Sequence, residues 1–253
     1  MKFRPCIDLH NGKVVQIVGG SLKDSNKGLQ TNFVSSDSAS DYAFRYMSDD
    51  LRGGHVVSLG SGNTAAAIEA LSTFPGGMQY GGGVNPDNAA DFLKAGASHV
   101  IVTSWIFSEN KLNERKLNQM RDCVGKDKLV LDLSCRMKNK EFYIVSNRWQ
   151  SFTEEKVDAA LLERLADYCS EYLVHGVDVE GKRQGIQKDL ITTLGKHSPI
   201  PVTYAGGVQK LDDLNLVRDL GQDKVDLTIG SALDIFGGKI KYSDVLEWMK
   251  VNS

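Results

Sequence analysis

Short runs of β-branched and other apolar residues recur eight times along the 253-residue chain, and helix-like stretches separate them. Several runs are almost continuously apolar, as expected of parallel strands that are covered on both faces. Alternating strands and helices predict a parallel sheet with right-handed crossovers. Eight such units in about 250 residues predict one closed (β/α)₈ barrel, the TIM-barrel form of an α/β fold. The runs are Arg4–Leu9, His55–Leu59, Met78–Tyr80, His99–Thr103, Lys128–Leu133, Tyr172–Val179, Pro201–Tyr204 and Val225–Ile229.

The chain also repeats itself at half its length. The strand-like segments around Asp8 and Asp132 are similar and lie 124 positions apart, as do the glycine pairs that begin at Gly82 and Gly206. A third pair of segments follows in the same order and ends in Ser104 and Ser231. Three matches in register indicate a duplicated half-barrel. We therefore expect a single domain over residues 1–253, with half-barrels of approximately 1–125 and 126–253.

Capping residues mark the expected helix boundaries. Thr153 is the predicted N-cap of a helix whose apolar positions repeat about every 3.6 residues. Asn85 and Pro86 are the predicted N-cap and first residue of another helix, which Gly96 ends. A third helix ends before Gly221. The apolar positions are Val157, Leu161, Leu165 and Tyr168 in the first of these helices, and Leu211, Leu214, Val217 and Leu220 in the third.

Composition narrows the class of protein. The net charge is −2 and no basic block occurs, so neither a nucleic-acid nor a membrane-surface role is expected. No apolar stretch is long enough for a signal peptide or a membrane span. The four cysteines form no C-x-x-C pair, which indicates free thiols in a reducing compartment. We expect a cytoplasmic protein that is a monomer. The cysteines are Cys6, Cys123, Cys135 and Cys169.

Glycine, serine and threonine residues follow four of the predicted strands. Such residues let backbone N–H groups approach an anion closely, at the end of the barrel where active sites form. An isolated Gly-Gly would be explained by a tight turn alone, but two equivalent clusters predict two phosphate sites. A ligand with a phosphate at each end would fit both. The clusters are Gly81, Gly82, Gly83, Thr103 and Ser104 in the first half, and Gly206, Gly207, Gly230 and Ser231 in the second.

Carboxylates stand at the ends of three predicted strands. Asp8 ends the first strand and Asp132 the fifth, and the half-barrel symmetry places them opposite each other at the mouth. Asp178 and Glu180 end the sixth. Two carboxylates in different environments can act as base and acid. The alternative is that Asp8 and Asp132 only cap helices or anchor loops.

No metal or cofactor site is expected. The five histidines lack ligand spacing, and no nucleophile elbow, Walker loop or dinucleotide fingerprint occurs. His10 follows the first strand and is a candidate to touch substrate. Proton transfer by carboxylates alone needs no cofactor.

Motifs spread over roughly residues 4 to 240 carry a family resemblance. They are Cys6-Ile7-Asp8-Leu9-His10-Asn11-Gly12-Lys13-Val14-Val15, Gly81-Gly82-Gly83-Val84, Val130-Leu131-Asp132-Leu133 with Arg136, Trp149-Gln150, Ala205-Gly206-Gly207-Val208 and Gly230-Ser231-Ala232-Leu233. In this combination the chain resembles the phosphoribosylformimino-aminoimidazole-carboxamide ribotide isomerases of histidine biosynthesis. Asp178-Val179-Glu180-Gly181 resembles their eukaryotic branch.

The resemblance implies an Amadori rearrangement that converts an aminoaldose to an aminoketose. It implies that Asp8 is the base that removes the proton on sugar C2. An acid from the loop after strand six protonates the ring oxygen. Trp149 would lie on a loop that closes over the substrate, and Asp132 would support binding or loop position. The stretch Gly19–Thr31 is the other expected lid, with Gly19 a candidate to contact substrate.

One segment departs from the family pattern. The loop after strand six is two residues shorter than in bacterial members, and Val177 stands where they carry a threonine. Alignment on Gly181 makes Glu180 the acid, whereas alignment from the strand makes it Asp178. We favour Glu180.

Rival functions remain open at this point. The sister cyclase barrel of imidazole glycerol phosphate synthase shares the repeat and the paired aspartates, but it usually opens Leu-Asp-Val and carries a lysine at or near Gln16. A non-catalytic sensor of a bisphosphate ligand is a rival of another class, which the intact Asp8, Asp132 and Glu180 disfavour. Some relatives also accept the tryptophan-pathway substrate, and no residue here decides that question.

Overall fold

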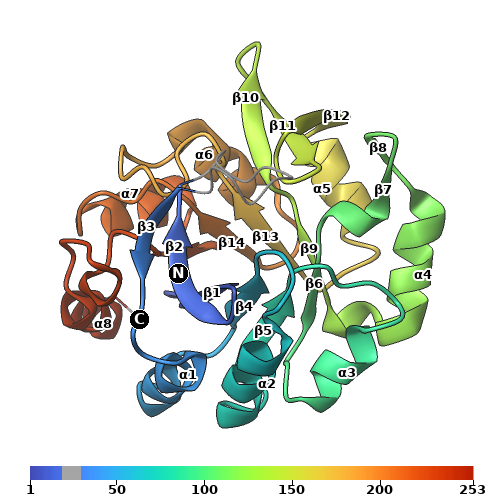
Figure 1. Ribbon diagram of the computed structural model, residues 1–253. Coiled ribbons are helices and arrows are strands. Elements are labelled where there is room, and N and C mark those ends of the chain that lie inside the picture. The colour runs from blue at the N-terminus through green and yellow to red at the C-terminus, as the bar shows by residue number, and fades with distance from the viewer. Residues whose placement is uncertain (19–29, 253) are drawn as a thin grey trace.

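The computed structural model describes residues 1–18 and 30–252 and confirms the (β/α)₈ barrel (Figure 1). Eight parallel strands follow one another around the sheet. A parallel bridge between Phe3, in the segment just before the first strand, and Leu227 of the last strand closes the ring, and the Arg4 backbone N–H donates to the Leu227 carbonyl at 2.8 Å. The strands are β1 (Cys6–His10), β4 (Gly54–Ser58), β5 (Met78–Gly81), β6 (Val100–Val102), β9 (Leu129–Asp132), β13 (Glu171–His175), β14 (Val202–Ala205) and β15 (Val225–Thr228).

Helices surround the sheet on its outer face (Figure 1). Their apolar sides pack on outward-facing strand residues in one continuous buried core. They are α1 (Ala39–Ser48), α2 (Thr64–Thr73), α3 (Ala89–Lys94), α4 (Glu114–Val124), α5 (Ala159–Leu165), α6 (Lys188–His197), α7 (Asp213–Leu220) and α8 (Tyr242–Val251), with short 3₁₀ helices η1 (Ser104–Ile106), η2 (Lys126–Lys128) and η3 (Asp234–Phe236).

Antiparallel strands extend the barrel at its mouth. A hairpin pairs with β1, a small hairpin follows η1, and a three-stranded sheet stands above the barrel after β9 (Figure 1). The sequence pattern had not predicted these antiparallel strands. They are β2 (Lys13–Ile17) and β3 (Thr31–Val34), then β7 (Phe107–Ser108) and β8 (Lys111–Leu112), then β10 (Cys135–Lys138), β11 (Glu141–Ser146) and β12 (Ser151–Lys156).

Inside the barrel, side chains from alternate positions of each strand form layers. Strand β13 shows the order: Glu171 lies at the amino end, Leu173 in the middle and His175 at the mouth, while Tyr172 and Val174 face the helices. The middle layer is apolar and the other two are polar. The polar side chains of the mouth layer can therefore take part in binding or proton transfer.

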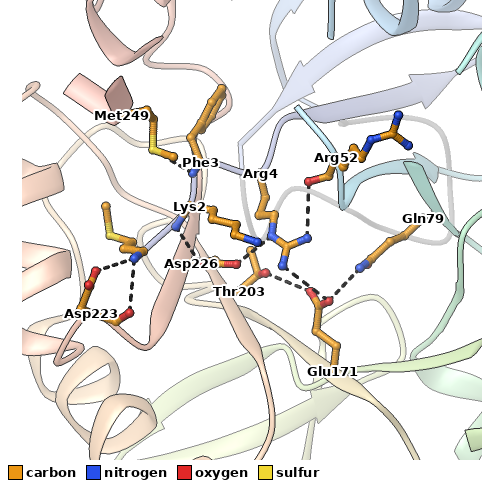
Figure 2. A network of polar contacts seen from close by, with 11 residues as sticks. Lys2, Phe3, Arg4, Arg52, Gln79, Glu171, Thr203, Asp223, Asp226 and Met249 are labelled. Carbon is orange, nitrogen blue, oxygen red and sulfur yellow. Dashed lines mark hydrogen bonds and ion pairs between the residues drawn. The ribbon is translucent and has the colours of Figure 1, made fainter. Parts of the chain in front are cut away.

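The amino-end layer is a network of paired polar side chains (Figure 2). Arg4 Nε donates to Asp226 at 2.8 Å, and its guanidinium lies 4.0 Å from Glu171. Gln79 and Thr203 donate to the two Glu171 oxygens at 3.1 and 3.0 Å. Because a buried carboxylate is costly unless it is paired, these contacts explain how Glu171 is tolerated in the core.

The expected helix starting at Thr153 is wrong. Residues Ser151–Lys156 form β12, which pairs antiparallel with β11. Thr153 Oγ1 donates to the Ile144 carbonyl instead of capping a helix. Helix α5 begins six residues after Thr153, at Ala159, and Asp158 caps it by accepting from the Leu161 N–H at 3.1 Å.

Two other expected boundaries also need correction. Asn85 and Pro86 form a turn and not a helix start, and Asn88 is the N-cap residue of α3, at Ala89–Lys94. The sixth strand ends at His175 and not at Val179, because Gly176 begins the loop. The third helix ends before Gly221 as predicted. In residues 1–18 and 30–252, no helix has the length and apolar character needed to cross a membrane.

Candidate active site

Three polar side chains of the mouth layer meet in one cavity of about 70 Å³. Asp8 comes from β1, Asp132 from β9 and His175 from β13. Glu180, from the loop after β13, lines the same cavity, and Trp149 borders it from the β11–β12 turn. The structure thus brings together Asp8, Asp132 and Glu180, as the sequence predicted.

Asp8 lies beside Gln16 and Glu180. Gln16 Nε2 lies 3.3 Å from Asp8 Oδ2, and its amide packs so closely on Gly230 that any side chain there would collide with it. Burial and the nearby Glu180 carboxylate raise the pKa of Asp8 to about 7, against the lowering effect of His175. A carboxyl with such a pKa is well suited to accept a proton at neutral pH.

Asp132 is held by three donors. Ser134 Oγ donates to Oδ1 at 2.7 Å, His175 Nδ1 lies 3.2 Å from the same oxygen, and Thr103 Oγ1 donates to Oδ2 at 3.3 Å. Burial alone would raise the pKa of Asp132, but the His175 charge and the hydrogen bonds from His175 and Ser134 lower it overall. Asp132 therefore stays ionised.

His175 is the cationic partner in this pair. Burial lowers its pKa, but the Asp132 charge and hydrogen bond outweigh that effect and raise the pKa to about 9. The neighbouring His55 has the opposite character, because burial and the His175 charge lower its pKa to about 3. The cavity thus holds one imidazolium among three carboxyl groups at neutral pH.

Glu180 and Asp178 have different surroundings. Asp178 accepts from Arg136 Nε and from the Met137 backbone N–H, both at 2.8 Å, and it lines none of the three mouth cavities. Glu180 Oε2 is buried without a hydrogen-bond partner among the described residues, and burial raises the Glu180 pKa. The structure therefore separates the two candidate acids and turns only Glu180 toward the cavity.

The first glycine cluster borders a cavity of about 500 Å³. Gly82, Gly83, Thr103 and Ser104 line it, together with Trp105 and Arg148 among others. Gly82 has φ +107°, and a Cβ there would lie 2.3 Å from the Ser58 carbonyl oxygen, so only glycine fits. Gly81 belongs to β5, and its backbone lies against Ile101 and Val57 instead of bordering the cavity.

The second glycine cluster borders a separate cavity of about 20 Å³. Gly206, Gly207, Gly230 and Ser231 all line it, with Glu180, Arg183 and Thr228. Gly206 has φ +123°, and a Cβ there would approach Glu180 Oε2 to 3.1 Å. The acid candidate and the second cluster are thus neighbours, and Gly206 and Gly230 also border the central cavity.

Trp149 lies in the tight turn that joins β11 to β12. Asn147, Arg148 and Trp149 all have left-handed backbone angles, with φ of 50°, 54° and 67°. Such angles are uncommon outside glycine and mark a conformation held by its surroundings. The turn carries Trp149 to the border of both the large and the central cavity, with its ring centroid 6.0 Å from that of His175.

Two other predicted contact residues lie elsewhere. His10 Nδ1 faces the Leu59 carbonyl at 2.9 Å, and His10 borders none of the three cavities. Gly19, and most of the expected lid Gly19–Thr31, lies outside the described residues. Within the described ranges, no group of three His, Cys, Asp or Glu side chains could hold a metal ion.

Reasoning from the sequence missed several residues that line these cavities, among them five polar ones that bear on binding or proton transfer. His175 had seemed one of several scattered histidines because its partner Asp132 is 43 positions away. In the sequence, Gln16 served only to distinguish the chain from the cyclase barrel, which carries a lysine at or near this position. The β1–β2 hairpin places Gln16 beside Asp8. Arg183 lies in the loop that carries Glu180, and this position in the sequence could have indicated it as a site residue. The five residues are Gln16, Arg148, His175, Arg183 and Thr228.

Comparison with known proteins identifies the family of this chain. The chain matches the family described as histidine biosynthesis protein over residues 2–241. Three relatives carry the name 1-(5-phosphoribosyl)-5-((5-phosphoribosylamino)methylideneamino) imidazole-4-carboxamide isomerase. The one from Medicago truncatula, named as chloroplastic, is 53% identical over 98% of this chain and 81% of its own length. Those from Yarrowia lipolytica and Saccharomyces cerevisiae are 49% and 44% identical, over 98% of this chain and 97% of each relative. This chain therefore belongs to the histidine biosynthesis protein family.

Proposed function

We propose that this protein is an isomerase of histidine biosynthesis that performs the Amadori rearrangement of the bisphosphorylated aminoaldose for which its relatives are named. One observation carries the proposal: two separate glycine-lined cavities flank a central cavity that holds Asp8 and Glu180. The name of the relatives describes a compound with a phosphoribosyl group at each end. A phosphate in each outer cavity would hold the middle of such a molecule against the two carboxyl groups.

The unequal cavities favour one orientation of the substrate. The cavity beside Glu180 is much the smaller, at about 20 Å³, whereas the cavity with Trp105 and Trp149 has about 500 Å³. The imidazole carboxamide and its ribose need the larger space and an aromatic surface. The reacting sugar would then extend from the small cavity past Glu180 to Asp8.

In this orientation, Glu180 and Asp8 divide the proton transfers. Burial keeps Glu180 protonated to a higher pH than an exposed glutamate, so that it can donate to the sugar ring oxygen as the C1–O bond breaks. The protonated imine that forms makes the C2 hydrogen acidic, and Asp8 removes it. The resulting enaminol takes up a proton at C1 from Asp8 and loses its C2 hydroxyl proton to the Glu180 carboxylate, which gives the aminoketose and returns both carboxyl groups to their starting states. Overall, C2 loses one hydrogen and C1 gains one.

Asp132 and His175 would act through charge and position. The ionised Asp132 fixes the His175 ring, whose positive charge favours ionisation of both Asp8 and Glu180. This charge keeps part of the Asp8 population in the basic form at neutral pH. Anchoring at both ends adds the benefit of orientation, which can account for a large part of a rate enhancement.

Turnover of the purified protein tests the proposal. The aminoaldose is incubated with the protein, and the aminoketose is separated by chromatography and identified by mass. Conversion supports the isomerase. Binding without conversion would support the sensor, and conversion of the aminoketose only when ammonia is supplied would support the cyclase.

A cytoplasmic location and a monomeric state complete the proposal. All four cysteines are free thiols, and three are buried, which fits a reducing compartment. Light scattering on the purified protein measures its mass, and a mass of twice the chain mass would contradict the monomer. Fluorescence imaging of the tagged chain tests the compartment.

A further inference from the structure

We propose that Arg183 and Thr228 bind the phosphate in the small cavity, in addition to the glycine cluster. The proposal rests on the proposed function and assigns two side chains to one end of its substrate. It starts from an unusual concentration of unpartnered atoms. Across residues 1–18 and 30–252, three buried side-chain polar atoms lack a hydrogen-bond partner, and all three belong to residues that line this cavity, Glu180 and Thr228 standing where it meets the central one. They are Arg183 Nε, Thr228 Oγ1 and Glu180 Oε2.

Buried donors without acceptors are rare because each one costs about 1–3 kcal/mol. Two of the three groups, the Arg183 N–H and the Thr228 hydroxyl, are donors that an anion can satisfy. Gly206, Gly207 and Ser231 line the same cavity, and backbone N–H groups of such residues can add further donors. A phosphate oxygen is the acceptor that matches this set of donors.

The loop backbone holds Arg183 toward the cavity. Gly181 lies against β2, because a Cβ there would be 2.1 Å from the Ile17 carbonyl oxygen, and its own carbonyl accepts from Asn32 at 2.7 Å. On the other side of Arg183, the Gly185 N–H donates to the Gly207 carbonyl at 2.8 Å. Arg183 itself has φ 53°, an uncommon angle for a residue with a side chain. The chain is thus fixed on both sides of a strained arginine.

A positive charge in the small cavity would also offset the negative charges of Glu180 and a bound phosphate. Glu180 lines the same cavity, and after it has donated its proton its carboxylate would repel a phosphate. No ion pair joins Arg183 to an acidic residue in the described part of the chain. A guanidinium stays charged at all relevant pH values and its planar fork matches phosphate oxygens. Arg183 is therefore placed to offset Glu180 and to bind the anion.

Substitution of Arg183, measured against its exposed neighbour, tests the assignment. Arg183→Met keeps the side-chain length but loses the charge and the donors. It should raise KM about 30-fold, change kcat less than about threefold, and weaken competitive inhibition by inorganic phosphate in parallel. Lys182→Met is the matched control, since Lys182 is exposed and its Nζ donates to the Asp178 carbonyl at 2.6 Å, and it should leave KM unchanged.

Two further variants keep the test decisive if Arg183→Met does not fold. Arg183→Lys should show an intermediate KM, and Thr228→Val, which is nearly isosteric, should raise KM about fivefold. Folding of each variant is checked by its thermal midpoint. Wild-type KM and phosphate inhibition in folded Arg183 variants would overturn the assignment, as would a loss of kcat alone.

The two proposals fail separately. If wild-type protein does not convert the aminoaldose, the isomerase proposal falls. Calorimetric titration with inorganic phosphate then still tests the subsite, because wild-type protein should bind phosphate and Arg183→Met should bind it at least tenfold more weakly. Equal binding by both would overturn the subsite, whatever the reaction.

Discussion

Asp8→Asn should make the protein more stable at alkaline pH while removing most of its activity. Burial and the Glu180 charge raise the pKa of Asp8 to about 7 from its ordinary 3.8, so the folded state favours the neutral carboxyl. Asparagine is neutral at every pH, has nearly the same shape, and its amide oxygen can still accept from Gln16 Nε2, which lies 3.3 Å from the Asp8 carboxylate in the wild-type protein. The substitution therefore removes a charge that folding opposes.

The magnitude follows from linkage. Each pKa unit is worth about 1.4 kcal/mol, so the shift of Asp8 corresponds to at most about 4 kcal/mol. The folded protein binds this proton more tightly than the unfolded chain does. The stabilising contribution is thus fully present below pH 3.8 and is lost as the pH rises through about 7. The variant should equal wild type near pH 4 and exceed it by up to about 4 kcal/mol at pH 8.

Urea unfolding at pH 4.5, 6 and 8 measures this difference, and kcat is measured on the same samples. The kcat of Asp8→Asn should fall a hundredfold to ten-thousandfold, the usual contribution of a positioned base, with ligand affinity kept within about tenfold. Asp178→Asn is the control, because it loses the Arg136 ion pair and should not gain stability at pH 8. A difference between Asp8→Asn and wild type that stays constant with pH, or a less stable variant at pH 8, would refute the reasoning.

Three further predictions concern the same cavity. Glu180→Gln should lower kcat at least a hundredfold and Asp178→Asn less than tenfold in the turnover assay, and the reverse order would name Asp178 as the acid. His175→Asn should lower the free energy of unfolding by up to about 3 kcal/mol at pH 6, and by less at pH 9.5. The reason is that the raised His175 pKa stabilises the fold below pH 6.5 and this effect is lost as the pH rises through about 9; urea titration at both pH values checks it, and an equal loss at both contradicts it. Trp149→Ala should raise KM about tenfold through lost stacking, while the unfolding free energy changes by less than about 1 kcal/mol, and an unchanged KM would remove Trp149 from the binding surface.

The repeat at 124 positions carried most of the prediction of fold and site. Residues that end equivalent strands must meet at the same end of a barrel, so Asp8 and Asp132 were expected in one place, and both border the central cavity. The glycine pairs at Gly82 and Gly206 were located in the same way. The apolar run that forms a strand, and the residue at its end, are neighbours in the chain, so both can be recognised from the sequence alone.

Pairings between distant segments could not be read in this way. The stretch Ser151–Lys156 contains a good capping residue and two glutamates, but its pairing with β11 decided its conformation. The cavity lining also depends on such contacts: Gln16 reaches Asp8 because the β1–β2 hairpin folds back, and His175 meets Asp132 through adjacent strands. Asp178 ended a predicted strand, yet it pairs with Arg136 and lines none of the three cavities.

The removal of hydrogen from C2 of the reacting sugar is the central chemical claim, and an isotope effect tests it most directly. Aminoaldose with deuterium at C2 and the ordinary compound are each mixed with excess purified protein, and formation of the aminoketose is followed over a single turnover. Both should be converted, and the deuterated compound should react more slowly, because breaking the C2 bond limits the step assigned to Asp8. Equal rates, or no conversion of either compound, would contradict the account.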